Sequence, residues 1–389
     1  MSNKQKFLFA FLLIALVPLK AQKVIWDKVY KKNKGIIFTV TETNDGCFVI
    51  GGEIDYQDGH GEDVYLAKMD KNGKKIWEKR FGGDYDDKCH ALSKTKDGGF
   101  ILAGAKTPYT KEDFFGSIPE ELDVYLIKTD KDGNKLWEKT FGGKDRDIAS
   151  AVLETKNGNF IIAGYSFSYG AGYIDVYVIK TDKNGNKIWE KTFGGKEKDK
   201  ANAIIQTKDG NFIIAGVTES FGSGEGDIYL IKIDGNGKKI WSKTFGGKKD
   251  DEAHAILENE DGGLIIAGRK GLGDLLLIKT DKNGNKIWQK TFGGEDGEEA
   301  YSIIETEDGF ITAGYTNSYG NKEDFYLIKV DKKGNKIWEK MIGTKEYQEI
   351  AYSISRCPDG GFIVAGFTNI VTGFYVPHIV RINDESGER

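Results

Sequence analysis

The amino-acid sequence predicts an all-β fold, a seven-bladed β-propeller with four antiparallel strands in each blade. Three observations support this prediction. Similar segments recur about every fifty residues, each segment contains two hairpin signals, and the last segment lacks a strand that the start of the chain can supply. All seven tryptophans occupy one position of the repeat, with spacings of 51, 60, 52, 52, 47 and 50 residues: Trp26, Trp77, Trp137, Trp189, Trp241, Trp288 and Trp338.

One repeat unit shows how the residues predict four strands, which we name A to D in chain order. In the fourth unit they are 201–207, 211–217, 227–234 and 238–244. Strands A and B are apolar and joined at Asp209-Gly210, because Asp and Gly suit tight hairpins. Strand C is apolar on both sides, as expected of a strand buried on both faces. Strand D is more polar and is predicted to lie outermost.

The units follow one another along the chain with short connections. The first six are predicted at 35–81, 88–141, 148–193, 200–245, 252–292 and 299–342. The seventh has only strands A, B and C, at 350–357, 361–367 and 376–383. Residues 22–30, which resemble a lone D strand, are therefore predicted to pair with His378–Ile382 and to close the ring.

An open solenoid is the main structural alternative to a closed ring. It requires polar capping repeats, and neither end of the chain has one. In the closed ring, the Trp and Phe side chains of each outer strand are expected to wedge one blade against the next.

Residues 1–21 differ from everything that follows. Lys4 and Lys6 precede an apolar run of 13 residues, Phe7–Leu19, which is too short to span a bilayer and fits a signal-peptide core. Leu19-Lys20-Ala21 provides a cleavage site, so we expect residues 22–389 to form one exported domain, periplasmic or extracellular, without a transmembrane segment. The net charge is −4, and nothing in the sequence indicates a basic nucleic-acid surface.

Two segments resemble a known family. DVYVIKTDKNGNKIWEKTFGG (175–195) resembles the tryptophan-docking motif of PQQ-type propeller repeats. ANAIIQTKDGNFIIAG (201–216) resembles the companion segment of secreted bacterial and archaeal propeller proteins, some of which are labelled lectin-like. The resemblance covers nearly all of 22–389 and implies the propeller fold. PQQ dehydrogenases have eight blades and a vicinal cysteine pair, and the similar outer-membrane assembly lipoprotein has eight blades and a lipid-bearing cysteine. This chain lacks these features, so neither activity is implied.

The connections between strands B and C (B–C loops) are the variable part of an otherwise monotonous repeat. Variable loops on a rigid scaffold commonly carry binding residues. These loops contain aromatic side chains that suit stacking on sugars or on a protein partner. The alternative is that they only pin their own loops. The candidate ligand-binding residues are Tyr109, Phe114, Phe115, Tyr169, Tyr173, Phe221, Tyr319 and Tyr375.

An acidic residue precedes strand A in nearly every unit, and we expect this set to ring the mouth of the central channel. Converging carboxylates bind hard cations such as Ca²⁺, which makes Ca²⁺ a possible ligand. One copy per blade favours the alternative, that each carboxylate caps its own loop by accepting N–H bonds. The positions are Asp87, Asp147, Asp199, Asp251, Glu298 and Glu349.

Catalysis has little support, and no catalytic residue, resident metal or cofactor is predicted. His90 and His254 share one repeat position with Ser150, Asn202, Tyr301 and Tyr352, and they lie three blades apart. Cys47 and Cys357 map to blades that ring closure makes neighbours, which raises the hypothesis of a disulfide across the seam.

These observations favour an exported, monomeric, non-catalytic propeller that binds a glycan or a protein through its B–C loops. A purely structural envelope or surface assembly protein is the first alternative, and a glycan-active hydrolase is the second.

Overall fold

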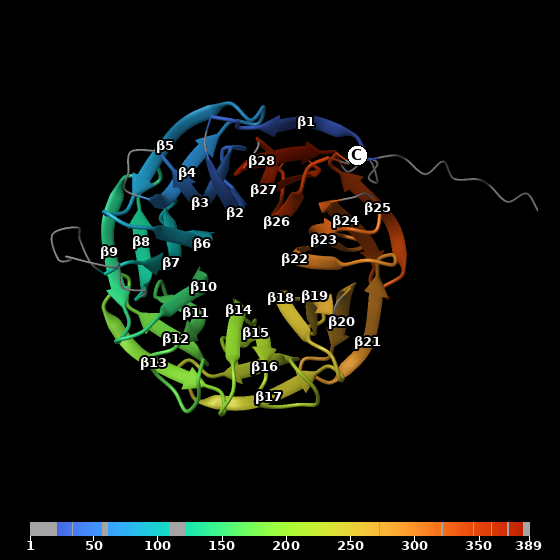
Figure 1. Ribbon diagram of the computed structural model, residues 1–389. Helices are drawn as coiled ribbons and strands as arrows, with labels where there is room; N and C mark the ends of the chain where they lie inside the picture. The colour runs from blue at the N-terminus through green and yellow to red at the C-terminus, as the bar shows by residue number, and fades with distance from the viewer. Residues whose placement is uncertain are drawn as a thin grey trace, which may run out of the picture.

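The computed structural model describes residues 22–32, 34–56, 61–108, 121–271, 273–319, 322–344, 346–358, 360–371 and 373–383. Within these ranges the chain forms seven four-stranded antiparallel sheets arranged in a ring around a central axis (Figure 1). The predicted seven-bladed β-propeller is therefore confirmed. No described residue belongs to a helix long and apolar enough to cross a membrane.

Strand A of each blade lies next to the central channel, and strand B follows it outward. The A strands are β2 (Lys34–Glu42), β6 (Asp87–Lys94), β10 (Asp147–Glu154), β14 (Asp199–Gln206), β18 (Asp251–Glu258), β22 (Glu298–Glu305) and β26 (Glu349–Arg356). The B strands are β3 (Phe48–Asp55), β7 (Phe100–Lys106), β11 (Phe160–Ser166), β15 (Phe212–Thr218), β19 (Leu264–Lys270), β23 (Gly309–Thr316) and β27 (Phe362–Val371).

Strands C and D complete each blade toward the rim. The C strands are β4 (Glu62–Met69), β8 (Asp123–Thr129), β12 (Asp175–Thr181), β16 (Asp227–Ile233), β20 (Asp274–Thr280), β24 (Asp324–Asp331) and β28 (Phe374–Ile382). The D strands are β5 (Lys75–Phe81), β9 (Lys135–Phe141), β13 (Lys187–Phe193), β17 (Lys239–Phe245), β21 (Lys286–Phe292), β25 (Lys336–Ile342) and, for the seventh blade, β1 (Val24–Val29).

The ring closes as the sequence predicts. β1 pairs antiparallel with β28, with Trp26 opposite Arg381 and Val29 opposite His378. The seventh blade thus takes its outer strand from the start of the chain and its other three strands from the end, which leaves β28 with a partner on both sides.

Several strand boundaries differ from the predicted ones by a residue or two, and two of the differences change the interpretation. Strand A already includes the acidic residue that the sequence analysis places just before the strand. Asp199, for example, pairs with Thr218 in the ladder and donates its backbone N–H to Ile174 O at 2.8 Å. In the seventh blade, the segment predicted as a loop is a continuation of the β27–β28 hairpin, in which Val371 lies opposite Phe374.

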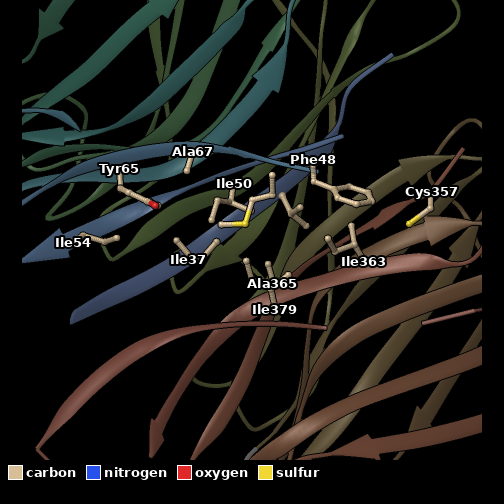
Figure 2. Close-up of a cluster of buried hydrophobic side chains, with 12 residues drawn as sticks. Ile37, Phe48, Ile50, Ile54, Tyr65, Ala67, Cys357, Ile363, Ala365 and Ile379 are labelled. Carbon is tan, nitrogen blue, oxygen red and sulfur yellow. The ribbon is translucent and has the colours of Figure 1, made fainter. Parts of the chain in front are cut away.

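The hydrophobic core lies between blades. Each buried cluster combines residues of two neighbouring sheets, and Figure 2 shows the one that joins the last blade to the first. There, Phe48 and Ile50 of β3 pack with Ile363 and Ala365 of β27. Because each layer is shared, no blade buries its apolar faces alone, and the ring is stabilised as a whole.

The outer-strand tryptophans wedge neighbouring blades together, as expected. Trp137 packs on Phe160 of the next blade with ring centroids 5.8 Å apart. Trp26 continues the pattern across the seam, because it packs against the cluster that contains Phe48 and donates its indole N–H to Lys71 O at 2.9 Å.

No disulfide joins Cys47, Cys89 and Cys357, all of which lie in the part of the chain that the structure describes. Cys357 is buried in the seam cluster next to Phe48, while Cys47 lies at the A–B turn of the first blade. The disulfide hypothesis for Cys47 and Cys357 is therefore wrong, and apolar packing together with the β1–β28 ladder closes the ring.

Candidate functional site

The two faces of the ring differ in how much the residues of their connections vary from blade to blade. One face, here called the turn face, carries the short A–B and C–D turns, such as the one at Gly185, whose φ of +79° favours glycine. The opposite face carries the B–C loops and the D–A connections between blades, and we call it the loop face. The candidate site is built on the loop face because side chains differ from blade to blade there.

Three B–C loops place an aromatic ring on strand C of their own blade. Tyr169 packs on Tyr177 with centroids 5.5 Å apart, and Phe221 packs on Tyr229 at 5.6 Å. Tyr319 lies against Tyr326 at 6.2 Å. One side of each ring is therefore held by the blade, while 39–46% of each residue stays exposed to solvent. The rings both pin their loops and present a surface.

The other predicted aromatic residues on the described loops are also exposed. Tyr173 is 61% exposed and packs edge-on against Phe167 at 5.5 Å. Tyr375 is 44% exposed and packs on Phe367 at 4.5 Å. Phe374, which the prediction omitted, is exposed as well, and Lys34 Nζ lies 3.4 Å from its ring centroid. Tyr109, Phe114 and Phe115 lie outside the described residues.

All six acidic residues at the start of strand A are buried, with 0–3% of each residue exposed. They lie under the loops rather than open at the channel mouth. Asp147 Oδ2 accepts hydrogen bonds from Gly143 N and Ser168 Oγ, both at 2.7 Å. Asp199 repeats this arrangement with Gly195 N at 2.8 Å and Ser220 Oγ at 2.7 Å. The carboxylates thus tie a D–A connection to the loop that carries the aromatic ring.

Other members of the acidic set have the same kind of partners. Glu298 accepts from Thr316 Oγ1 at 2.7 Å and from Gly294 N at 3.1 Å, and Asp251 accepts from Gly271 N at 3.2 Å. Burial raises the pKa of Asp87 to about 7. Within the described ranges, no three His, Cys, Asp or Glu side chains converge in a way that could hold a metal ion.

Strand A places a second ring of variable side chains around the channel, just below the loop face. This position holds Phe38, His90, Ser150, Asn202, His254, Tyr301 and Tyr352, one from each blade. Aromatic contacts connect five of the seven blades. The centroids of Phe38 and Tyr352 are 5.0 Å apart, and those of Tyr352 and Tyr301 are 4.9 Å apart. His90 and His254 end this aromatic arc at 5.6 Å and 4.9 Å from their neighbours.

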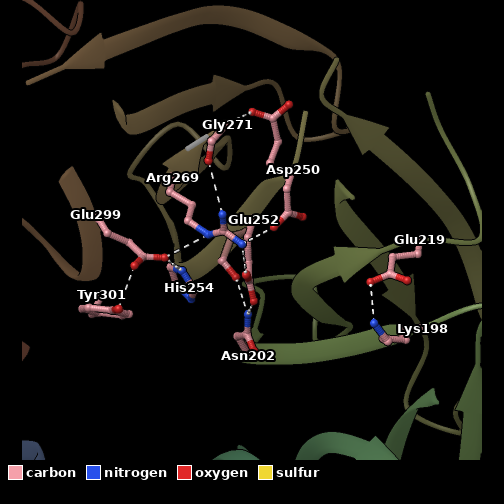
Figure 3. A network of polar contacts seen from close by, with 12 residues as sticks. Lys198, Asn202, Glu219, Asp250, Glu252, His254, Arg269, Gly271, Glu299 and Tyr301 are labelled. Carbon is pink, nitrogen blue, oxygen red and sulfur yellow. Dashed lines mark hydrogen bonds and ion pairs between the residues drawn. The ribbon is translucent and has the colours of Figure 1, made fainter. Parts of the chain in front are cut away.

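A polar network adjoins one end of the arc (Figure 3). Arg269 of β19 lies between two carboxylates, with Nη2 3.0 Å from Glu252 Oε2 and Nε 3.2 Å from Glu299 Oε1. Glu299 also accepts from Tyr301 OH at 2.7 Å and contacts His254 Nε2 at 2.5 Å. Arg269 additionally binds Asp250, and Asn202 Nδ2 donates to Glu252 at 2.9 Å.

The charges of this network shift the pKa values of its glutamates and of its histidine in opposite directions. Burial acts to raise the pKa of Glu252 and Glu299, but the nearby His254 and Arg269 and their hydrogen bonds outweigh burial, so both carboxyl pKa values are lowered. A glycoside hydrolase needs one carboxyl group with a raised pKa as a general acid. The Glu252–Glu299 pair does not offer one.

We expect His254 to titrate above pH 6.5. Burial lowers its pKa, but the hydrogen bond and charge of Glu299, together with the charge of Glu252, raise it by more. Because the pKa of His254 is higher in the folded state than in the unfolded state, this residue stabilises the folded protein fully below about pH 6.5. That contribution is lost as the pH rises through the folded-state pKa. An NMR titration of the imidazole signals in wild type and in Glu299→Gln measures the pKa of His254. The substitution should lower the midpoint of the His254 titration.

His90 is the internal control for that titration. It contacts Ala149 O through Nδ1 at 2.9 Å, and burial lowers its pKa. Its midpoint should therefore lie below 6.5. A His254 midpoint at or below that of His90 would contradict the network geometry.

A shallow depression of about 600 Å³ lies on the loop face beside this network. It forms where the B–C loop of the fifth blade is short, and Lys249, Lys270, Gly273 and Asp296 are among the residues that line it. Sequence reasoning missed both the channel ring and the depression. The sequence did contain a signal for the channel ring. The residue at this strand-A position differs from blade to blade, apart from two blades that share histidine and two that share tyrosine.

The closed ring and its variable loop face define a β-propeller of the binding or scaffolding class. The family model described as outer membrane protein assembly factor BamB matches residues 24–271, which is more than half of the chain. The chain therefore belongs to this family of PQQ-like repeat propellers.

A curated relative is the regulatory protein FlaEY of Caulobacter vibrioides. It is 25% identical over an alignment of 225 positions, which covers 51% of this chain and 23% of the relative. The chain thus spans less than a quarter of that protein's length.

Solved structures resemble the fold. The WD40 domain of Neurospora crassa Pan2 has a TM-score of 0.56 and 11% identity, with 95% of this chain and 97% of that one covered. A protein of unknown function from Dyadobacter fermentans has a TM-score of 0.51 and 12% identity, with 93% and 99% covered.

Proposed function

We propose that this protein is an exported, non-catalytic binding propeller that engages a glycan or a protein partner through its loop face. One observation carries the proposal. Every exposed large aromatic side chain in the described part of the chain lies on a B–C loop or, in the seventh blade, at the start of β28 in the hairpin that replaces this loop: Tyr169, Tyr173, Phe221, Tyr319, Phe374 and Tyr375. The exposed apolar side chains on the rim are not aromatic. They occur once per blade, except on β25, which has both Ile337 and Met341, and such scattered side chains are ordinary for a protein surface.

The chemistry of these residues suits recognition rather than reaction. Tyr and Phe present large, rigid surfaces at low entropic cost, and they stack on sugar rings or fill a partner's pockets. Their backs are fixed on Tyr177, Tyr229 and Tyr326, so little ordering is required when a ligand binds. The depression beside Lys249 and Lys270 adds polar groups to the same face.

The combined substitution of Tyr169, Phe221 and Tyr319 by alanine is expected to weaken ligand binding about 100-fold, at about 1 kcal/mol for each ring. Binding is measured by thermal shift against oligosaccharides and divalent cations, followed by capture from an envelope fraction. A ligand that binds only the folded state raises the unfolding midpoint.

The matched control replaces Ile188, Ile240 and Ile287 by alanine. These residues are 50–59% exposed on the D strands and lie away from the loop face. Equal losses in both triple variants would refute the loop-face proposal. A shift with Ca²⁺ alone would instead move the site to the acidic residues at the start of strand A, and no ligand at all would favour a purely structural protein.

A further inference from the structure

A cleft of about 350 Å³ lies between the sixth and seventh blades, where β1 closes the ring. None of its lining residues belongs to the exposed aromatic set or to the channel ring. Val29 of β1, Ile342 of β25 and Ile370 of β27 form apolar walls, and Glu349 and His378 face it with polar groups.

Two departures from the repeat explain why this cleft exists here. The outer strand of the five preceding blades ends with a phenylalanine that packs on the next blade, as Phe193 packs in the cluster of Tyr229. β25 ends instead with Ile342, and the tyrosine position of the next blade holds His378. Both replacements remove volume at the same interface. Phe325 fills part of it, with its ring centroid 4.7 Å from that of His378.

His378 lines this cleft and has a buried hydrogen-bonding atom without a partner among the described residues. The residue is 3% exposed, and its Nε2 lies 2.7 Å from Asp27 Oδ1. Because an ionised carboxylate only accepts, Nε2 of the neutral ring donates and Nδ1 is left as an acceptor. Among the described residues Nδ1 has no partner, although a buried polar atom normally has one.

Glu349 provides a second acceptor. Its carboxylate accepts weakly from Thr344 N and Thr368 Oγ1, both at 3.3 Å. Burial, together with the charge of Asp324, raises its pKa to about 7. Lys340 is the only lysine among the described residues that line the cleft, and it already donates to Gln22 O at 2.9 Å. The cleft thus combines two acceptors and nearby carboxylates with apolar walls.

We propose that the seam cleft is a binding site for small primary amines, independent of the loop-face function. The ammonium group donates to His378 Nδ1 and to the Glu349 carboxylate. The alkyl part lies against Val29, Ile342 and Ile370. An ammonium ion supplies the donors that both acceptors lack and the positive charge that Asp27, Asp324 and Glu349 favour.

The test uses the full chain with n-butylamine, n-butanol and butyrate as probes. Binding of each probe is measured by titration calorimetry and by the NMR signals of the His378 imidazole. We expect saturable binding of n-butylamine, weaker binding of n-butanol and none of butyrate. n-Butylamine should bind more tightly at pH 8 than at pH 6, because Glu349 ionises in this range while the amine stays protonated. Among the described residues, Lys340, Asp27 and His378 are the other charged or titratable groups that line the cleft, and the charge of Asp324 also acts on Glu349.

Two variants restore the residues of the repeat, and both are expected to fold. Ile342→Phe and His378→Tyr refill the cleft and should each weaken n-butylamine binding at least tenfold. Ile337→Phe, on the exposed side of the same strand, is the control and should bind as wild type does. The proposal is overturned if wild type shows no saturable binding, if the three probes bind alike, or if the refilled variants bind as tightly as wild type.

Discussion

Deleting residues 22–30 is expected to destabilise the protein by at least about 3–5 kcal/mol, the cost of one large core truncation. The deletion removes β1, exposes the edge of β28 and takes Trp26 out of the cluster shared by the first and last blades. Chemical denaturation monitored by tryptophan fluorescence measures the loss. A second early transition is also expected, because the seventh blade can then open before the others.

A matched pair of point variants separates ring closure from ordinary packing. Trp26 and Trp189 occupy the same repeat position and donate to equivalent backbone carbonyls, Lys71 O and Gly235 O. Both alanine variants lose the wedge, but only Trp26→Ala also loosens the strand that closes the ring. If the two variants are equally stable, β1 does not have the closing role that we assign to it.

Gly216→Ala is expected to cost roughly 3 kcal/mol or more, at the upper end for overpacking. A Cβ atom at this position would lie 1.9 Å from Lys200 O, a backbone atom that cannot rotate away. The close approach arises at the strand-A bulge next to Ala201, and each blade repeats it. Thermal unfolding of the variant measures the cost.

Gly235→Ala is the control for that substitution. No atom lies within 4 Å of a Cβ atom at Gly235, and its φ is not in the left-handed region. This variant should unfold within a few tenths of a kcal/mol of wild type. A Gly216→Ala variant that is equally stable would show that strands A and B are further apart than the structure has them.

The ring could be predicted from sequence because its determinants are local and repeated. The tight turn at Gly185 and the wedge at Trp189 each recur at a fixed spacing, and the missing seventh strand has one obvious donor in residues 22–30. Local signals and global closure agree, which is when patterns in a sequence are most informative.

The channel ring could not be predicted in the same way. A strand alternates its faces strictly, but the bulge between Ala201 and Ala203 interrupts the alternation. Counting alternate residues from the strand ends therefore does not identify the strand-A side chains that face the channel. The seam cleft depends on Ile342 and His378, whose packing together is a property of the closed ring.

The predicted aromatic residues lie on the loop face, and the prediction that they bind a ligand stays a prediction. The sequence could not show that Tyr169 is half packed and half exposed, since both outcomes suit an aromatic residue in a loop. Likewise, a carboxylate in every blade could not reveal the Ser168–Asp147 hydrogen bond, which needs the B–C loop to fold back over strand A.

Hydrogen–deuterium exchange with and without the bound ligand tests most directly whether the loop face is the binding surface. The loops 167–174 and 219–226 should become protected, while the turns 182–186 and 234–238 on the opposite face should exchange as in the free protein. Protection confined to the turns would contradict the loop-face assignment.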